Sequence, residues 1–258
     1  MRKVFAIAGI TVREALRQKL AVNLLVFALA LVVASFTIST LTFGEQYRII
    51  VDVGLSAMEL FGTLIAAFLG AGLIARDVER RTVYPIIAKP VSRAAYVVGR
   101  YLGLVATTSL NLLVMAVVFT SVLAFYLRGV GFLHDSPYLA VLASLAVRFA
   151  VVGAIAAFFS CFTTATLSAI FTLSLVVAGL LSSDLVRYWA QQGPVARAVG
   201  RAAFVLVPNM EVLNLKEAMV YKDALPLSFA MTGLGYGLLY AAAVVAFATA
   251  IFSRRDLR

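Results

Sequence analysis

The stretch that decides the fold is GLIARDVERRTVYPIIAKPVSRAAYVVGR, residues 72–100. It holds six basic residues, two acids and two prolines, in a chain that is 63% hydrophobic. Apolar runs lie on both sides of it, over residues 53–75 and 101–127. A helix needs about 20 apolar residues to cross a hydrocarbon layer ~30 Å thick, and each run is long enough. The charged stretch therefore predicts a connector between two membrane-spanning helices.

The composition of the whole chain agrees with a membrane location. Only 13% of the 258 residues are charged and the mean hydropathy is +1.00, which is too apolar for the surface of a soluble domain. In lipid, only helices or a closed barrel satisfy every backbone group. The apolar runs are continuous rather than alternating, which excludes a barrel. We therefore predict an all-α integral membrane protein, with residues 1–258 forming a single transmembrane domain.

Six apolar segments predict six transmembrane helices. The longest apolar stretch, residues 138–183, would be ~70 Å long as one helix, so we expect it to fold back within SCFTTAT, residues 160–166. The predicted spans are residues 20–43, 53–75, 101–127, 138–161, 164–183 and 227–252. Residues 1–19 mix charges with apolar side chains and predict an amphipathic helix in the membrane interface. Residues 184–226 predict an external helical segment between spans 5 and 6.

The distribution of charge predicts the orientation in the membrane. The N-terminus, the connector of residues 76–100 and the C-terminus together hold fourteen Lys and Arg residues and four acids, a net charge of +10. The rest of the chain holds eight of each, a net charge of zero. Basic loops stay in the cytoplasm, so we expect both termini and the connector to be cytoplasmic. The same reading assigns the excess positive charge to membrane orientation and not to nucleic acid.

The connector has the pattern of a short rigid helix. Thr82 is a suitable N-cap, and Pro85 then falls in the first turn, where its missing N–H is not needed. The helix has to stop near Lys89, because the residue before Pro90 avoids the helical region. Ser92 can cap the helix of the third span. Such a helix would offer apolar side chains to a partner, whereas a plain basic loop would bind anionic lipid.

ERRTVYPIIAKPVSRAAYVVGRYLG, residues 79–103, resembles the cytoplasmic signature of the permeases of type-2 ABC exporters. The matching residues are Glu79, Thr82, Ile86, Ile87, Pro90, Val91, Ser92, Arg93, Gly99, Arg100 and Gly103. Arg81 stands where the family usually has glycine. TVREALRQKL before the first span and VPNMEVLNLKEA, residues 207–218, extend the resemblance. The latter is similar to the branch that contains the permease for nitrous-oxide-reductase maturation.

The resemblance implies a function for the connector. In that family the connector holds a coupling helix that docks on a separate nucleotide-binding subunit. The docking residues here would be Glu79, Arg80, Arg81, Thr82, Val83, Tyr84, Ile86, Ile87 and Lys89. The implied partners are two ABC ATPase subunits, a second permease copy (identical or a paralogue) and the lipids of a prokaryotic inner membrane.

The chain itself carries no sign of an enzyme. It has no G-x-x-x-x-G-K-[ST] motif, so ATP and Mg²⁺ are expected on the partner subunit and no cofactor on this chain. One histidine, His134, and one cysteine, Cys161, do not make a metal site.

Two charges lie inside the predicted spans, Glu59 in the second and Arg148 in the fourth. Charges at such depth face a partner or a wet cavity, which makes a substrate path or gate one reading. The other reading is a structural pair, or charges that reach the headgroups. The hydroxyls of Ser35 and Thr40 could line the same path or hydrogen-bond between helices.

Two other functions are compatible with the sequence. A non-transporting membrane anchor for a multiprotein complex would also need several spans and a basic cytoplasmic face. A secondary transporter normally shows internal repeats, and none is evident in this chain.

Overall fold

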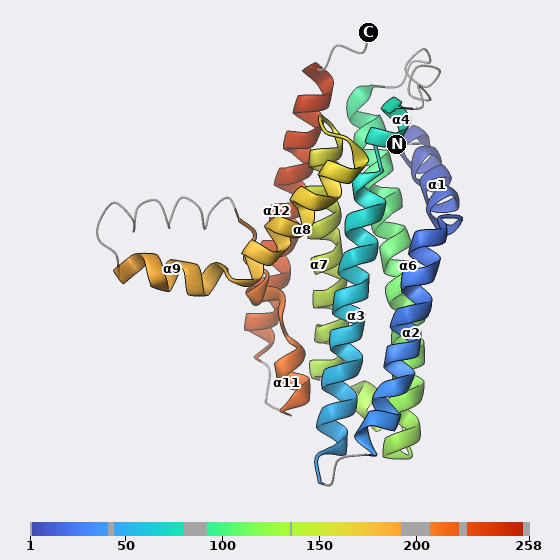
Figure 1. Cartoon of the computed structure of the whole chain (residues 1–258), viewed down its shortest axis with the longest axis vertical. Coiled ribbons are helices and arrows are strands. Elements are labelled where there is room, and N and C mark those ends of the chain that lie inside the picture. Colours follow the sequence, from blue (N-terminus) through green and yellow to red (C-terminus); the bar gives the residue numbers. More distant parts are fainter. Residues whose placement is uncertain are drawn as a thin grey trace.

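The computed structural model describes residues 2–40, 44–79, 92–134, 136–191, 207–221 and 226–254. Within these residues every regular element is a helix, and the long helices run side by side along one axis (Figure 1). Five helices are long and apolar enough to cross a membrane, and they cover Lys19–Ser39, Gln46–Glu79, Arg93–Leu127, Pro137–Ser160 and Leu227–Arg254. The prediction of an all-helical membrane protein is confirmed.

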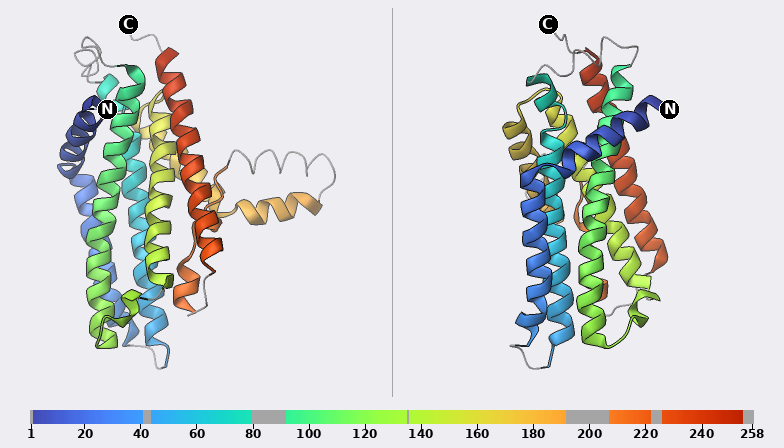
Figure 2. Two further views of the ribbon diagram at one scale, coloured as in Figure 1. Left: turned by 180° about the vertical axis from the view of Figure 1, so that it is seen from behind. Right: turned by 90° about the vertical axis from the view of Figure 1, so that its right-hand side faces the viewer.

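The first half of the bundle contains four helices before the connector. Helix α1 covers Arg2–Leu16, α2 Lys19–Ser39, α3 Gln46–Ala71 and the short α4 Ala75–Glu79. Helix α1 runs obliquely across the bundle and packs on α6 (Figure 2). Helices α2 and α3 are antiparallel neighbours, and a turn at residues 72–74 separates α3 from α4.

The second half begins with α6, Arg93–Leu127, which starts earlier than the predicted span of residues 101–127. A 3₁₀ turn η1, Gly131–His134, leads to α7, Ser136–Ser160. Helix α8 covers Ala165–Leu180, α9 Ser182–Gln191, η2 Glu211–Leu213, α11 Lys216–Val220 and α12 Leu227–Arg254. The start of α1 and the end of α12 lie at the same end of the bundle (Figures 1 and 2).

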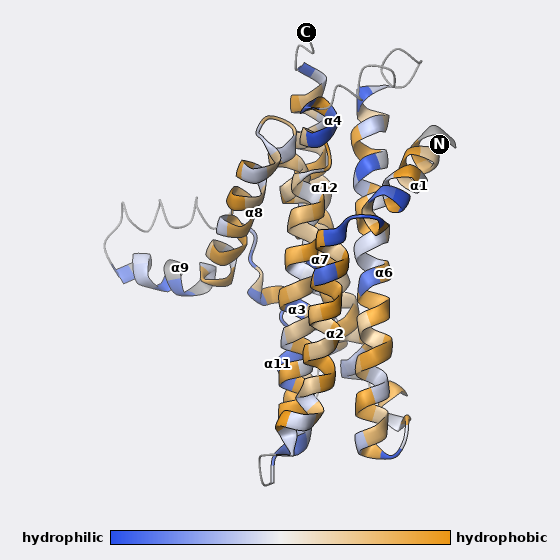
Figure 3. Cartoon of the chain, turned by 45° about the vertical axis from the view of Figure 1, so that its right-hand side comes forward, coloured by the Kyte–Doolittle hydropathy of each residue, from blue (hydrophilic) through white to orange (hydrophobic). Residues whose placement is uncertain are grey.

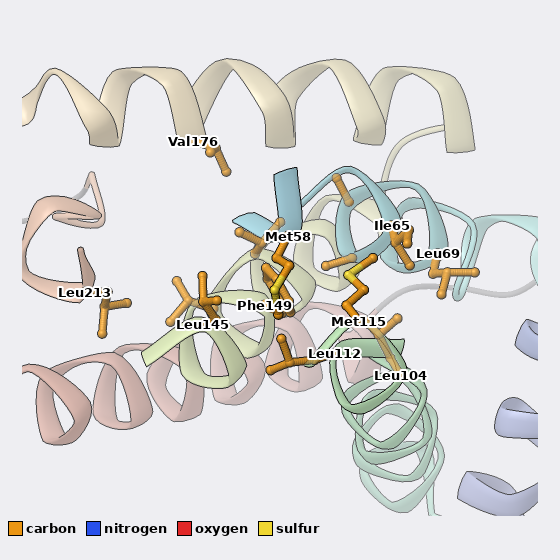
Figure 4. Packing of buried hydrophobic residues seen from close by; sticks show 14 of the residues in the cluster. Met58, Ile65, Leu69, Leu104, Leu112, Met115, Leu145, Phe149, Val176 and Leu213 are labelled. Atoms are coloured by element: carbon orange, nitrogen blue, oxygen red, sulfur yellow. The ribbon is translucent and has the colours of Figure 1, made fainter. Parts of the chain in front are cut away.

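The core forms where α3 and α7 cross the middle of the bundle. Met58, Phe149 and Met115 meet there from α3, α7 and α6 and are almost completely buried (Figure 4). Glycines let these helices approach closely: a side chain at Gly62 would meet the ring of Phe149. The outer faces of α2, α6 and α12 expose large apolar side chains, which is the pattern of a surface in contact with lipid (Figure 3).

The predicted fifth span corresponds to a short helix. The chain folds back between Ser160 and Ala165, within the predicted turn, and the side-chain oxygen of Thr164 accepts from the N–H of Leu167 as an N-cap. Helix α8 has 16 residues, which at 1.5 Å per residue is ~24 Å, less than the hydrocarbon layer. After α8 the chain bends away from the bundle axis into α9 (Figure 1).

Part of the segment predicted to be external packs along the bundle. Residues 207–221 lie against α3, α7 and α12, where Met210, Leu213 and Met219 are buried. The N–H of Met210 donates to the carbonyl of Gly179 near the end of α8 (3.3 Å). Farther along, the Tyr47 hydroxyl donates to the carbonyl of Met219 (3.4 Å). The segment thus packs along the N-terminal half of α3.

Candidate functional site

The predicted docking helix of the connector, residues 83–88, lies outside the described residues. So do eight of the nine predicted interface residues: Arg80, Arg81, Thr82, Val83, Tyr84, Ile86, Ile87 and Lys89. Glu79 is described; it is exposed at the end of α4. What the structure defines is therefore the two ends of the connector and the residues that hold them.

The far end of the connector is capped as the sequence predicts. The Ser92 side-chain oxygen accepts from the N–H of Ala95 (3.2 Å), which starts α6. The Arg93 guanidinium donates to the carbonyl of Ser253 near the end of α12 (2.9 Å). The start of α6 is therefore tied to the last turn of α12.

Arg100 is the centre of a buried cluster between the two ends of the connector. Its Nη1 donates to the Glu14 carboxylate of α1 (2.6 Å), and its Nη2 donates to the Asp77 carboxylate of α4. Its Nε donates to the Tyr96 hydroxyl (3.4 Å), which itself donates to Asp77. The Arg100 side chain is 8% exposed and that of Asp77 9%, whereas Glu14 is 44% exposed. We refer to Arg100, Asp77, Glu14 and Tyr96 as the corner cluster.

Close packing of α1 and of α12 supports the corner cluster. A side chain at Gly99 would meet Ile7 and one at Gly103 would meet Thr11, so these glycines let α1 lie directly on α6. The ring of Tyr96 stacks on Phe252 of α12 (5.8 Å between centroids).

A hydroxyl from α7 supports the turn before α4. The buried Ser160 hydroxyl accepts from the N–H groups of Ile74 (2.9 Å) and Ala75 (2.8 Å) at the start of α4. The turn that leads into the connector is thus fixed to the end of α7.

A second charged cluster lies deeper in the bundle. The Glu59 carboxylate of α3 accepts from Nη1 of Arg148 on α7 (2.6 Å), and Nζ of Lys216 lies 3.7 Å away. Lys216 also donates to the Ser56 hydroxyl (3.0 Å). The Arg148 side chain is only 3% exposed, and its Nε has no hydrogen-bond partner among the described residues. We refer to Glu59, Arg148, Lys216 and Ser56 as the inner cluster.

The structure places Glu59 and Arg148 together and Ser35 and Thr40 apart from them. Ser35 is buried and donates to the carbonyl of Val32 (2.6 Å), so its hydroxyl is used within its own helix. Thr40 is exposed and donates to the carbonyl of Thr37 (2.7 Å). Thr40 lines an open depression of about 550 Å³ at the C-terminal ends of α2 and α6, together with Phe36, Ser39, Gln46, Ala124, Phe125, Tyr126 and Arg128.

The sequence analysis did not find the corner cluster, and it did not find that Lys216 belongs to the inner cluster. Asp77 and Glu14 were counted only as charge on the cytoplasmic side, and Arg100 only as charge and as a match to the family signature. The available signal was Arg100 itself, a cation flanked by Gly99 and Gly103 at the start of a span that is otherwise free of charge. No group of three or more metal-binding side chains occurs in the part of the chain that is described.

A bundle of five candidate spans with ion pairs buried inside it defines a multi-pass membrane protein. Residues 5–257 match the family described as ABC-2 family transporter protein, and the chain belongs to that family. It is therefore a membrane permease of an ABC transporter, a class that works with an ABC ATPase subunit. A comparison with curated proteins gave no match.

Proposed function

We propose that two copies of this permease assemble in a prokaryotic cell membrane with two separate ABC ATPase subunits. ATP hydrolysis on those subunits, with their Mg²⁺, would drive export of a substrate or its extraction from the membrane. The proposal includes six spans, with α8 and the segment of residues 207–221 together forming the fifth crossing. It also includes α1 as an interfacial helix, cytoplasmic termini, and kinship with the branch that contains the nitrous-oxide-reductase maturation permease.

The arrangement at one end of the bundle carries this proposal. The start of α1, the end of α4, the start of α6 and the end of α12 all lie there (Figures 1 and 2). These elements belong to the three sequence segments that together hold the +10 excess of charge, namely the N-terminus, the connector of residues 76–100 and the C-terminus. The ends of the connector are held by the corner cluster, so a subunit bound between Glu79 and Ser92 would pull directly on α3 and α6.

The inner cluster is the part of the proposal that concerns the substrate. Glu59, Arg148 and Lys216 carry one net positive charge at a depth where ions are costly. We infer that a substrate path runs past this cluster. Glu59→Gln keeps an oxygen for Arg148, so we expect normal complex yield and impaired transport.

The docking helix is tested by a substitution at its apolar face. Burial of one Ile against a partner contributes roughly 1.5–3 kcal/mol, and a carboxylate at the same place removes that gain and adds an unpaired charge. The Ile87→Asp permease should therefore insert normally but lose its ATPase or its control of hydrolysis. ATPase co-purification from membranes measures this.

The matched control is the double variant Arg80→Ala/Arg81→Ala. Charges at the rim of an interface mainly affect the association rate and salt sensitivity, so this variant should retain the ATPase. A basic loop that only binds lipid predicts the reverse order, with the arginines essential and Ile87 tolerant. Full retention and normal hydrolysis with Ile87→Asp would contradict the docking assignment.

A further inference from the structure

We propose that Arg100 is a positioning residue that joins α1 and both ends of the connector into one rigid body. A movement of the connector would then be passed to the interfacial helix α1 as well as to α3 and α6. This inference rests on the proposed function, because it assumes that the ATPase acts on the connector. It adds a task for α1 and names the side chain that carries it.

The first step is the geometry of the guanidinium. Its three nitrogens contact three different groups: Glu14, Asp77 and the hydroxyl of Tyr96. A guanidinium presents its donors in a fixed planar fork, so the two carboxylates cannot move independently of each other. A lysine ammonium at this position is a point charge on a flexible stem and would hold one carboxylate firmly at a time.

The second step is the place of these groups along the chain. Asp77 lies near the start of the connector of residues 76–100, and Tyr96 and Arg100 lie at its end. The Arg100–Asp77 contact therefore fixes the separation between the two ends of the connector. Ser160 holds the turn before α4 from the other side, so Asp77 has a fixed backbone.

The third step is the attachment of α1. Helix α1 packs mainly on α6, and its contact with α2, the next helix in the chain, is slight. Gly99 and Gly103 make the surface on which it lies. Phe5 and Ile10 lie outside this contact; they are strongly exposed and suited to the lipid interface. Glu14 is the ionic link between α1 and Arg100 in the described part of the chain, and the Thr11 hydroxyl adds a longer contact with the same Arg100 nitrogen (3.4 Å).

Two variants separate the α1 link from folding. Arg100→Lys keeps the buried positive charge beside Asp77 but loses the planar fork of donors, and Glu14→Gln changes a side chain that is 44% exposed. In both, the permease alone in lipid nanodiscs should show hydrogen exchange of α1 accelerated about three- to fivefold, which corresponds to less than about 1 kcal/mol. Exchange of α7 and the thermal midpoint should stay close to wild type. Arg13→Gln, an exposed charge on the same helix, is the control.

The second readout is the ATPase activity of the complex. Both variants should retain the ATPase subunit but lose most of the change in hydrolysis rate that the permease imposes. A purely structural role predicts instead that rate and thermal midpoint fall together. Faster exchange of α1 with normal control of hydrolysis would overturn the inference, and so would unchanged exchange. If the wild-type permease retained no ATPase, the proposed function would fail. The hydrogen-exchange result would still decide whether Arg100 links α1 to the ends of the connector.

Discussion

The corner cluster and the inner cluster are both built on a buried arginine, but they satisfy it differently. Every nitrogen of Arg100 contacts an oxygen, and two carboxylates share its charge. Arg148 contacts one carboxylate through Nη1, and its Nε has no partner in the described part of the chain. The corner cluster has a net charge of −1 and a half-exposed member, whereas the inner cluster has a net charge of +1 at greater depth.

This difference in hydrogen bonding indicates that the two clusters have different functions. A fully hydrogen-bonded charge network is rigid, because each movement breaks a strong contact. A cluster with an unsatisfied donor costs free energy as it stands and gains from a new acceptor. The corner cluster is thus suited to pass on a movement without deforming. The inner cluster is suited to change partners when a substrate or water comes near.

The largest expected effect is that of removing the inner carboxylate. Glu59→Leu leaves Arg148 and Lys216 without a counter-charge, and an uncompensated buried charge costs about 3–5 kcal/mol. Arg148→Leu should cost less, because Glu59 keeps Lys216 at 3.7 Å. Thermal unfolding of the purified permease in detergent compares the two. The double variant Glu59→Leu/Arg148→Met should recover most of the loss; equal losses for the two single variants would contradict the shared carboxylate.

The next effect ranks the two carboxylates of the corner cluster. Asp77 is buried with Arg100, so a double-mutant cycle between them should give an interaction of about 1–3 kcal/mol. Glu14 is 44% exposed, so solvent screens its pair and the cycle should give less than about 1 kcal/mol. Asp77→Asn, Glu14→Gln and Arg100→Gln supply both cycles. A stronger interaction of Arg100 with Glu14 than with Asp77 would mean that Arg100 mainly holds α1 and not the connector.

The sequence predicted the membrane helices well because apolar length alone decides them. The runs around Val32, Leu112 and Val245 are too long for anything but a span, and the corresponding helices are α2, α6 and α12. The Ser92 cap was also predictable, because capping depends on neighbours along the chain. Glu59 and Arg148 could be recognised as exceptional from their depth. Their mutual contact was one of two interpretations of the sequence, and the fold, which brings α3 and α7 together, shows that they are paired.

The sequence did not show which tertiary contacts its polar segments make. Residues 207–221 contain polar side chains between apolar ones, and their prediction as part of an external helical segment stays a prediction. The contacts of that segment come from the fold: Leu213 and Met219 are buried against the bundle, and Lys216 lies beside Glu59. Asp77 was counted as one acid in a basic loop, although it is one of the most buried carboxylates described.

A smaller effect concerns the segment of residues 207–221, which Lys216 ties to α3. Lys216→Met removes the contacts with Glu59 and Ser56 but leaves the stronger Glu59–Arg148 pair, and a partly exposed pair contributes less than about 1 kcal/mol. Stability should therefore change little, while hydrogen exchange of residues 216–220 becomes several-fold faster. Glu217→Gln, an exposed neighbour, is the control. A large loss of stability would place Lys216 among the structural charges of the bundle.

The smallest expected effect is a response to salt that only one cluster shows. Between about 0.1 M and 1 M salt the Debye length falls from ~10 Å to ~3 Å, which weakens exposed pairs far more than buried ones. The Arg100–Glu14 contact is the half-exposed one, so hydrogen exchange of α1 should rise about two- to threefold. Exchange around Arg148 should not change, because its side chain is 3% exposed. Glu14→Gln should abolish the salt response of α1; if the variant kept it, the response would come from lipid contacts of the basic residues and not from the corner cluster.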